Sequence, residues 1–254
     1  MKQIVFIIFV VIIGVSLFET LRLAWRISKG VRIAEKSIPF QTVSPDSDAR
    51  VLIIGDSTGV GTGSSRPEDS IAGRLASDFP FIEIVNLSVN GAEIGEIEKQ
   101  LQCSAADTFD VVLVQVGGND ILRFTPLTRV RSDMTAVLTR AGKKGREVIF
   151  MSTGNVGLAP AFFPPLSWIY TRRTRAVRAI FIKIAAREGI QYVDLFKERE
   201  EDPFIRDPKR FYAPDFLHPS GEGYRLWYEE LMKQTSITSI LDERMRIEHD
   251  NVGI

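Results

Sequence analysis

The stretch VLIIGDSTG, residues 51–59, decides how the fold of the whole chain is interpreted. Its first four residues are apolar, and a short apolar run that ends at a glycine is typical of a strand buried on both faces of a parallel sheet. Asp56 and Ser57 follow at once, where the chain turns toward a helix. Ligand sites of open α/β sheets form beyond the carboxyl ends of the strands. The stretch therefore predicts a buried strand with an exposed serine hydroxyl at its end.

Further along the chain, strand-like segments alternate with segments whose apolar residues recur at helical spacing. The strand-like segments are FIEIVNLSV (81–89), DVVLVQVGG (110–118), EVIFMSTG (147–154) and QYVDLF (191–196). GEGYRLWYEELMKQ (221–234) is expected to be the closing helix. Valine- and isoleucine-rich strands that alternate with amphipathic helices predict an α/β domain whose parallel sheet is covered on both faces.

Composition excludes several classes of protein. With 254 residues and 44% hydrophobic content, the chain is long enough for one domain with extensions. The 32 basic residues balance the 32 acidic ones, which argues against a nucleic-acid-binding protein. Cys103 is the only cysteine, so an intrachain disulfide and a cysteine-rich metal site are both excluded. We expect Cys103 to be a small buried side chain.

The N-terminus carries an apolar run from Ile4 to Phe18, preceded by Lys2. Fifteen residues fall short of the ~20 that cross a bilayer, but extension past Glu19 to Trp25 reaches that length. No cleavage site of the small-residue type follows Phe18. We therefore expect residues 1–25 to be an uncleaved signal-anchor, transmembrane helix rather than a cleaved signal peptide.

Basic residues follow at intervals of three or four, as on one stripe of a helix. They are Arg22, Arg26, Lys29, Arg32 and Lys36. Residues 26–50 are therefore interpreted as a basic juxtamembrane segment and linker. The stripe suits either anionic lipid headgroups or plain solvent. We expect the globular domain to span residues 51–235, and residues 236–254 to form a charged, peripheral tail.

The side of the membrane on which the domain lies stays open. Five basic residues after the apolar run, against Lys2 before it, favour a cytoplasmic domain. A secretory interpretation of the same leader places the domain outside. The expectation is a single-pass, membrane-anchored protein, with no prediction of its oligomeric state.

His218 is the histidine on which the site prediction depends. It lies in APDFLHPSGEGY (213–224), and the other histidine, His249, lies in the charged tail. A serine hydroxyl is a weak nucleophile unless an adjacent base accepts its proton. His218 is suited to act as that base for Ser57, and Asp215 is placed to orient the imidazole.

Two further segments offer donors for a developing oxyanion. Gly91, in VNGAEI, has an unobstructed backbone N–H group, and Asn119, in GGND, has a side-chain amide. Asp56 and Asp120 are interpreted as structural residues that support the turns around Ser57 and Asn119.

Together these segments resemble the SGNH (GDSL-type) hydrolase superfamily. The matching blocks are Gly55-Asp56-Ser57, Asn90-Gly91, Gly117-Gly118-Asn119-Asp120 and Asp215-Phe216-Leu217-His218-Pro219. They occur in the family's order within residues 50–235. Thr58 stands where the family's pattern often has leucine, which alters packing near the serine more than chemistry.

The resemblance implies a three-layer α/β/α, flavodoxin-like fold with a five-stranded parallel sheet. It also implies hydrolysis of an ester through a covalent acyl-serine, with no metal and no cofactor. Ser57 would be the nucleophile, with His218 as its base and Asp215 as the orienting residue. The N–H groups of Ser57 and Gly91 and the amide of Asn119 would form the oxyanion hole.

Two other motifs compete with this interpretation. GDSTG also fits the nucleophile elbow of α/β-hydrolases, but only one predicted strand precedes Ser57, and Asp215 and His218 share one loop. GVGTG (59–63) could suggest a dinucleotide-binding turn, but its glycines lack the G-x-G-x-x-G spacing.

The apolar loop VGLAPAFFPPLSWIY (156–170) is unusual for a connection between elements. We expect Phe162, Phe163 and Trp168 to line the acyl site or to face a membrane. The substrate could be a lipid ester, an acylated carbohydrate or a thioester. An O-acyltransferase that uses the same acyl-serine, and a catalytically silent membrane-anchored binding module, are the alternative functions.

Overall fold

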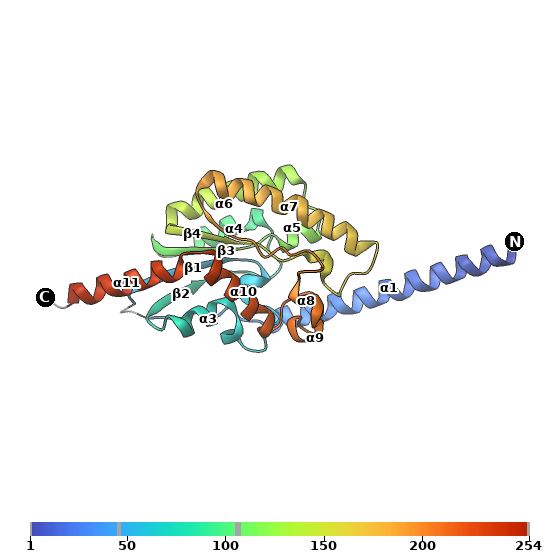
Figure 1. Cartoon of the computed structure of the whole chain (residues 1–254), viewed down its shortest axis with the longest axis horizontal. Helices are drawn as coiled ribbons and strands as arrows, with labels where there is room; N and C mark the ends of the chain where they lie inside the picture. Colours follow the sequence, from blue (N-terminus) through green and yellow to red (C-terminus); the bar gives the residue numbers. More distant parts are fainter. Residues whose placement is uncertain (1, 45–46, 105–107, 253–254) are drawn as a thin grey trace.

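A five-stranded parallel sheet forms the centre of the domain, with the strand order β2-β1-β3-β4-β5 (Figure 1). The computed structural model describes residues 2–44, 47–104 and 108–252. The strands are β1 (Ala49–Gly55), β2 (Ile82–Asn86), β3 (Phe109–Gln115), β4 (Gly145–Met151) and β5 (Gln191–Val193), and every neighbouring pair is parallel. The chain runs outward from β1 to β2 and then returns to β3 on the other side of β1. The carboxyl end of β1, where Ser57 follows, is therefore the topological switch point of the sheet.

Helices cover both faces of the sheet (Figure 1). One face is covered by α4 (Ile97–Cys103), α6 (Leu127–Lys144) and α7 (Leu166–Glu188), and the other by α3 (Ile71–Asp78), α10 (Gly221–Gln234) and α11 (Ile237–Val252). Successive residues of a strand point to opposite faces. Accordingly, Leu52 and Ile54 of β1 pack in one core, and Val51 and Ile53 pack in the other. The predicted three-layer α/β/α fold with a five-stranded parallel sheet is confirmed.

Short helical elements occupy the loops after the strands. After β1 comes α2 (Ser57–Val60), after β2 comes η2 (Ile94–Glu96), after β3 comes α5 (Gly118–Leu122), and after β4 comes η3 (Val156–Leu158). The remaining elements are η1 (Pro67–Asp69), α8 (Pro203–Arg206) and α9 (Pro208–Phe211). The polar blocks singled out in the sequence therefore meet at one edge of the sheet.

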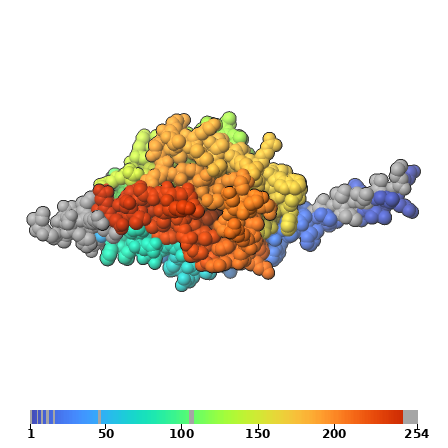
Figure 2. Space-filling model, viewed as in Figure 1, coloured from blue at the N-terminus to red at the C-terminus, as the bar shows by residue number. Residues whose placement is uncertain are grey.

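The N-terminal segment is one continuous helix, α1 (Lys2–Lys36), of 35 residues. Its first half projects away from the rest of the molecule (Figure 2). In the part of the chain that the structure describes, no helix has both the length and the apolar character needed to cross a membrane. The expected transmembrane helix over residues 1–25 is thus not supported. The apolar run stops at Phe18, short of the ~20 residues required, and Glu19 and Arg22 follow in the same helix.

The second half of α1 packs against the domain instead of forming a free linker. Arg22 and Arg26 donate hydrogen bonds to the carbonyl oxygen of Pro160. Beyond the helix, the hydroxyl of Thr42 accepts a hydrogen bond of 2.8 Å from the backbone N–H of Ile84, at the edge of β2. The segment expected to be a linker therefore contacts the domain twice, through α1 and again at Thr42. Residues 45 and 46 of the expected linker lie outside the described residues.

The tail expected to be peripheral instead begins as part of the core. Ile237 and Leu241 of α11 are fully buried, and Arg244 lies 2.8 Å from the carboxylate of Asp110 at the start of β3. Because Ile237 and Leu241 are four positions apart, they lie on one helix face, which packs on the sheet. The prediction failed because it judged residues 236–254 by their charges, which begin only at Asp242, and overlooked the uncharged stretch SITSIL (236–241) before them.

The prediction that Cys103 is buried is also wrong, since its side chain is exposed. It lies at the end of α4, whose buried residues are Ile97, Gln100 and Leu101. The spacing of these three residues defines one helix face, and Cys103 falls outside that face.

Candidate active site

Ser57 is the first residue of α2, directly beyond the carboxyl end of β1. Asp56 caps this helix, because its Oδ1 accepts hydrogen bonds of 2.8 Å from both the backbone N–H and the hydroxyl of Thr58. The carboxylate is 1% exposed, and burial raises the pKa of Asp56, although the bonds from Thr58 act in the opposite direction. Asp56 therefore supports the turn at Ser57, in agreement with the structural role expected for it.

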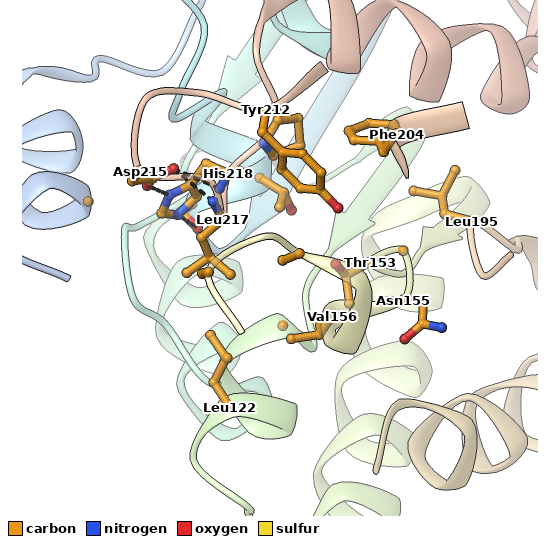
Figure 3. Close-up of a pocket in the computed structure, with 18 of the residues that line it drawn as sticks. Leu122, Thr153, Asn155, Val156, Leu195, Phe204, Tyr212, Asp215, Leu217 and His218 are labelled. Atoms are coloured by element: carbon orange, nitrogen blue, oxygen red, sulfur yellow. Dashed lines mark hydrogen bonds and ion pairs between the residues drawn. The ribbon is translucent and has the colours of Figure 1, made fainter. Parts of the chain in front are cut away.

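A chain of hydrogen bonds joins Ser57, His218 and Asp215. The Oγ atom of Ser57 lies 3.0 Å from Nε2 of His218. Nδ1 of His218 lies 2.6 Å from Oδ2 of Asp215, and these two side chains face each other in Figure 3. The other carboxylate oxygen, Oδ1 of Asp215, accepts from the backbone N–H groups of Leu217 and His218 at 3.0 and 3.1 Å. Burial raises the pKa of Asp215, but these bonds and the charge of His218 outweigh it, so the pKa lies below its ordinary value. An ionised Asp215 orients the imidazole toward the serine.

The loop that carries Asp215 and His218 is closed by backbone hydrogen bonds. The N–H of Ala213 donates to the carbonyl of His218 at 2.8 Å, and the N–H of Phe216 donates back to Ala213 at 2.8 Å. Phe216 adopts a φ of 59°, in the left-handed region, which tightens the turn between Asp215 and His218. The three-residue spacing between Asp215 and His218 thus fits a loop that leaves them little freedom.

Two of the expected oxyanion donors also line the cavity in front of Ser57. Gly91 has a φ of 79°, a conformation that favours glycine, and a Cβ atom there would meet only the Nη2 atom of Arg123, at 3.7 Å. Asn119 donates one hydrogen of its side-chain amide to the carbonyl of Ala92 at 3.0 Å. An amide nitrogen carries two hydrogens, so this bond orients the amide and leaves its second hydrogen for a ligand.

Asp120 connects the loop after β2 to the loop after β3. Its Oδ2 accepts a hydrogen bond of 3.0 Å from the backbone N–H of Ile94, and its side chain is 1% exposed. Burial raises the pKa of Asp120 to about 6. The sequence predicted that Asp120 supports the turn around Asn119. In the structure, Asp120 also supports the segment after Gly91, through its bond with Ile94.

The cavity in front of Ser57 has a volume of about 760 Å³ and is lined mainly by apolar side chains. Asp215 and His218 lie at one end of it, and the hydroxyl of Tyr212 points into it (Figure 3). The labelled apolar residues in this view are Leu122, Val156, Leu195, Phe204 and Leu217. Its size lies within the range of pockets that hold ligands far larger than an acetyl group.

Sequence reasoning missed most of this lining. One wall is formed by α1, with Leu23, Ile27 and Val31 at intervals of four residues. That spacing was visible in the sequence, but it indicates only a helix face and not what the face contacts. Tyr212 lies three residues before Asp215, and nothing in its local pattern distinguishes it from a core residue.

The aromatic residues of the 156–170 loop do not act together. Phe162 is 9% exposed, lines the cavity, and packs against Tyr170 with ring centroids 4.4 Å apart. Phe163 and Trp168 do not line it and are 50% and 70% exposed. The structure thus places Phe162 at the cavity and Phe163 and Trp168 away from it. For the two exposed side chains, the alternative of facing a membrane stays a prediction.

Comparison with known proteins identifies relatives with the same fold. The esterase TesA from Pseudomonas aeruginosa is 24% identical over 152 residues, which cover 58% of this chain and 71% of that protein. A member of the lipolytic G-D-S-L family from Veillonella parvula aligns with a TM-score of 0.58 at 19% identity, over 74% of this chain and 98% of that one. The acetylxylan esterase Axe2 from Geobacillus stearothermophilus aligns with a TM-score of 0.54 at 19% identity, over 76% and 96% of the two chains.

The model of the GDSL-like Lipase/Acylhydrolase family matches residues 53–226, which include Ser57, Gly91, Asn119, Asp215 and His218. This range covers more than half of the chain, and leaves α1 outside. The chain therefore belongs to the GDSL-like lipase/acylhydrolase family and is an ester-hydrolysing enzyme of the SGNH superfamily.

Proposed function

We propose that the protein is a serine esterase that cleaves carboxylic esters through an acyl-serine on Ser57. The observation that carries this proposal is the hydrogen-bonded series from Ser57 Oγ through His218 to Asp215, at 3.0 and 2.6 Å. Gly91 and Asn119 face the same cavity, so a nucleophile, a base and donors for an oxyanion surround one space.

In the first step, Oγ of Ser57 attacks the carbonyl carbon of the ester while Nε2 of His218 accepts the hydroxyl proton. The carbonyl π electrons move to oxygen, which becomes an oxyanion. The N–H groups of Ser57 and Gly91 and the free amide hydrogen of Asn119 stabilise it. Asp215 stabilises the imidazolium that forms and keeps the proton-bearing Nδ1 directed toward itself.

In the second step, the bond between the carbonyl carbon and the alcohol oxygen breaks, and His218 gives its proton to that oxygen. Water then attacks the acyl-serine, with His218 again as the base, and the acid and the free Ser57 hydroxyl are released. An acceptor alcohol in place of water would make the same intermediate an acyl donor. Analysis of products in the presence of sugar acceptors distinguishes these two outcomes.

Attachment to a membrane stays a prediction from the sequence and forms no part of this proposal. A silent binding module would not react with reagents that require an activated serine. The proposal is therefore tested by reaction of Ser57 itself.

The experiment is labelling of the full-length chain with a fluorophosphonate probe, with hydrolysis of p-nitrophenyl acetate measured in parallel. Ser57→Ala and His218→Ala are expected to abolish labelling and to reduce hydrolysis to background. Ser132→Ala is the matched control, because Ser132 is exposed on α6 and its hydroxyl bonds only within that helix, to Arg129 and Asp133. Undiminished labelling of folded Ser57→Ala, or no hydrolysis of any ester by the unaltered protein, would contradict the proposal.

A further inference from the structure

The second half of α1 forms one wall of the cavity that contains Ser57. Leu23, Ile27, Gly30, Val31 and Ala34 all line this cavity. They lie on one face of the helix, because residues four apart are neighbours along a helix. Since the backbone N–H and C=O groups within a helix bond to each other, this wall offers a ligand mainly aliphatic side chains.

The wall is incompletely covered. Leu23 packs against the core, but Ile27 is 58% exposed and Val31 is 52% exposed, although both border the cavity. Exposed aliphatic side chains beside a cavity favour an apolar ligand, because covering them with such a ligand removes apolar surface from water.

The one basic residue of α1 that borders this cavity has protein partners. Arg26 donates to the carbonyl oxygen of Pro160, and its guanidinium lies 4.8 Å from the ring centroid of Phe216. These contacts hold the guanidinium against Pro160 and Phe216. The wall therefore keeps its apolar character despite the basic stripe on α1.

The position of the wall is set by contacts at the catalytic end. A Cβ atom on Gly30 would lie 3.1 Å from Oδ2 of Asp215, so the helix backbone passes directly beside that carboxylate. The side-chain amide of Asn90 donates to the carbonyl of Ala34 at 3.0 Å, which joins α1 to the segment that carries Gly91. Because one cavity connects Ile27 and Val31 with Ser57, a chain bound on this wall belongs to the molecule that reacts at Ser57.

We propose that Ile27 and Val31 of α1 form a specificity-determining surface that binds an apolar chain of the ester. This inference rests on the proposed esterase function and names its substrate class as esters with a medium or long hydrocarbon chain. The wall lies outside residues 53–226, so it is a feature that this chain adds to the family domain.

The experiment compares two substrate series on the full-length protein. One series varies the acyl chain of p-nitrophenyl esters from acetyl to dodecanoyl, and the other varies the alcohol of alkyl acetates from ethyl to dodecyl. The unaltered protein is expected to prefer a longer chain in one series, which identifies the part of the ester that binds α1. The double variant Ile27→Gln/Val31→Gln is expected to lower the ratio of kcat/KM for the long ester to that for the acetyl ester by about tenfold, the effect of losing roughly two buried methylene contacts.

The matched control is Leu17→Gln/Leu21→Gln, on the same helix with the same spacing. Leu17 and Leu21 are 59% and 62% exposed, and neither borders the cavity. This control is expected to keep the full chain-length preference, and thermal unfolding verifies that both double variants are folded.

Three results would overturn the inference. One is an unchanged ratio in the Ile27/Val31 variant, another is an equal loss in the Leu17/Leu21 control, and the third is an unaltered protein with no preference for longer chains in either series. In all three results the acetyl esters are still cleaved, so the esterase function stands. If the unaltered protein cleaves no ester of either series, the proposed function fails and this inference fails with it.

Discussion

The Nε2 atom of His218 lies 3.0 Å from the Oγ atom of Ser57, although 161 positions separate the two residues in the chain. Ser57 follows β1, an interior strand of the sheet between β2 and β3, while His218 comes from the loop before α10. The parallel sheet brings these segments to one edge because every connection returns the chain to the same end of the next strand.

Asp215→Asn is expected to lower kcat for p-nitrophenyl acetate on the order of 10³–10⁴-fold. Asparagine offers no charge to stabilise the imidazolium and allows the unproductive tautomer of His218. Asp207→Asn is the control, because Asp207 is exposed and an asparagine can still cap α9. A decrease of less than tenfold in folded Asp215→Asn would show that Asp215 has no orienting role.

Asn119→Ala is expected to lower kcat on the order of 10²–10³-fold with little change in KM. The loss falls on kcat because the donor bonds most strongly to the charge that develops in the transition state. Gln102→Ala, which removes an exposed amide from α4, is expected to leave both constants unchanged. A rise in KM on the order of 10²–10³-fold, with no change in kcat, would instead assign Asn119 to substrate binding.

Asp120→Asn is expected to flatten the dependence of stability on pH between about pH 4 and pH 6. The folded-state pKa of Asp120 is raised to about 6, so in this window the folded protein retains a proton that the unfolded chain has lost. The free energy of unfolding of the unaltered protein therefore decreases as pH rises through the window.

Asparagine lacks this titration and can still accept the hydrogen bond from Ile94. Between pH 4.5 and pH 7, the free energy of unfolding of the variant should therefore decrease by about 2 kcal/mol less than that of the unaltered protein. Urea denaturation at the two pH values measures this difference. Equal losses in the two proteins would mean that Asp120 titrates near its ordinary pKa.

Phe162→Ala and Phe163→Ala are expected to differ although the residues are adjacent. Phe162 is 9% exposed, so its truncation is expected to lower the free energy of unfolding by about 3 kcal/mol and to change the acyl-chain preference. Phe163 is 50% exposed, and its ring contacts the guanidinium of Arg22 at 4.0 Å, so its truncation should cost less than about 1 kcal/mol. Urea denaturation measures the stability of each variant, and the p-nitrophenyl ester series measures its acyl-chain preference. Equal effects of the two substitutions would contradict the placement of Phe162 at the cavity and of Phe163 away from it.

The sheet and its covering helices were predictable because each depends on a local pattern. The run from Val51 to Gly55 coincides with the end of β1, and the segment 221–234 coincides with α10. Where the pattern was weak, prediction failed. Cys103 was assigned by residue type alone, and Ile237 and Leu241 lie in a short uncharged stretch that was grouped with the charged residues after Asp242.

The sequence by itself determined the strands, the order of the polar blocks and which residues are candidates for the reactive groups. These features depend on short-range spacing. An apolar run that ends at a glycine, or a pair of residues three positions apart, adopts a similar local structure wherever it occurs. Only the tertiary structure decided that Ile27 and Val31 of α1 face the cavity and that Phe162 does so while Phe163 does not. An apolar helix stripe has the same period against lipid, protein or an open cavity, so what it contacts depends on distant segments, such as Pro160 and Phe216, that hold it in place.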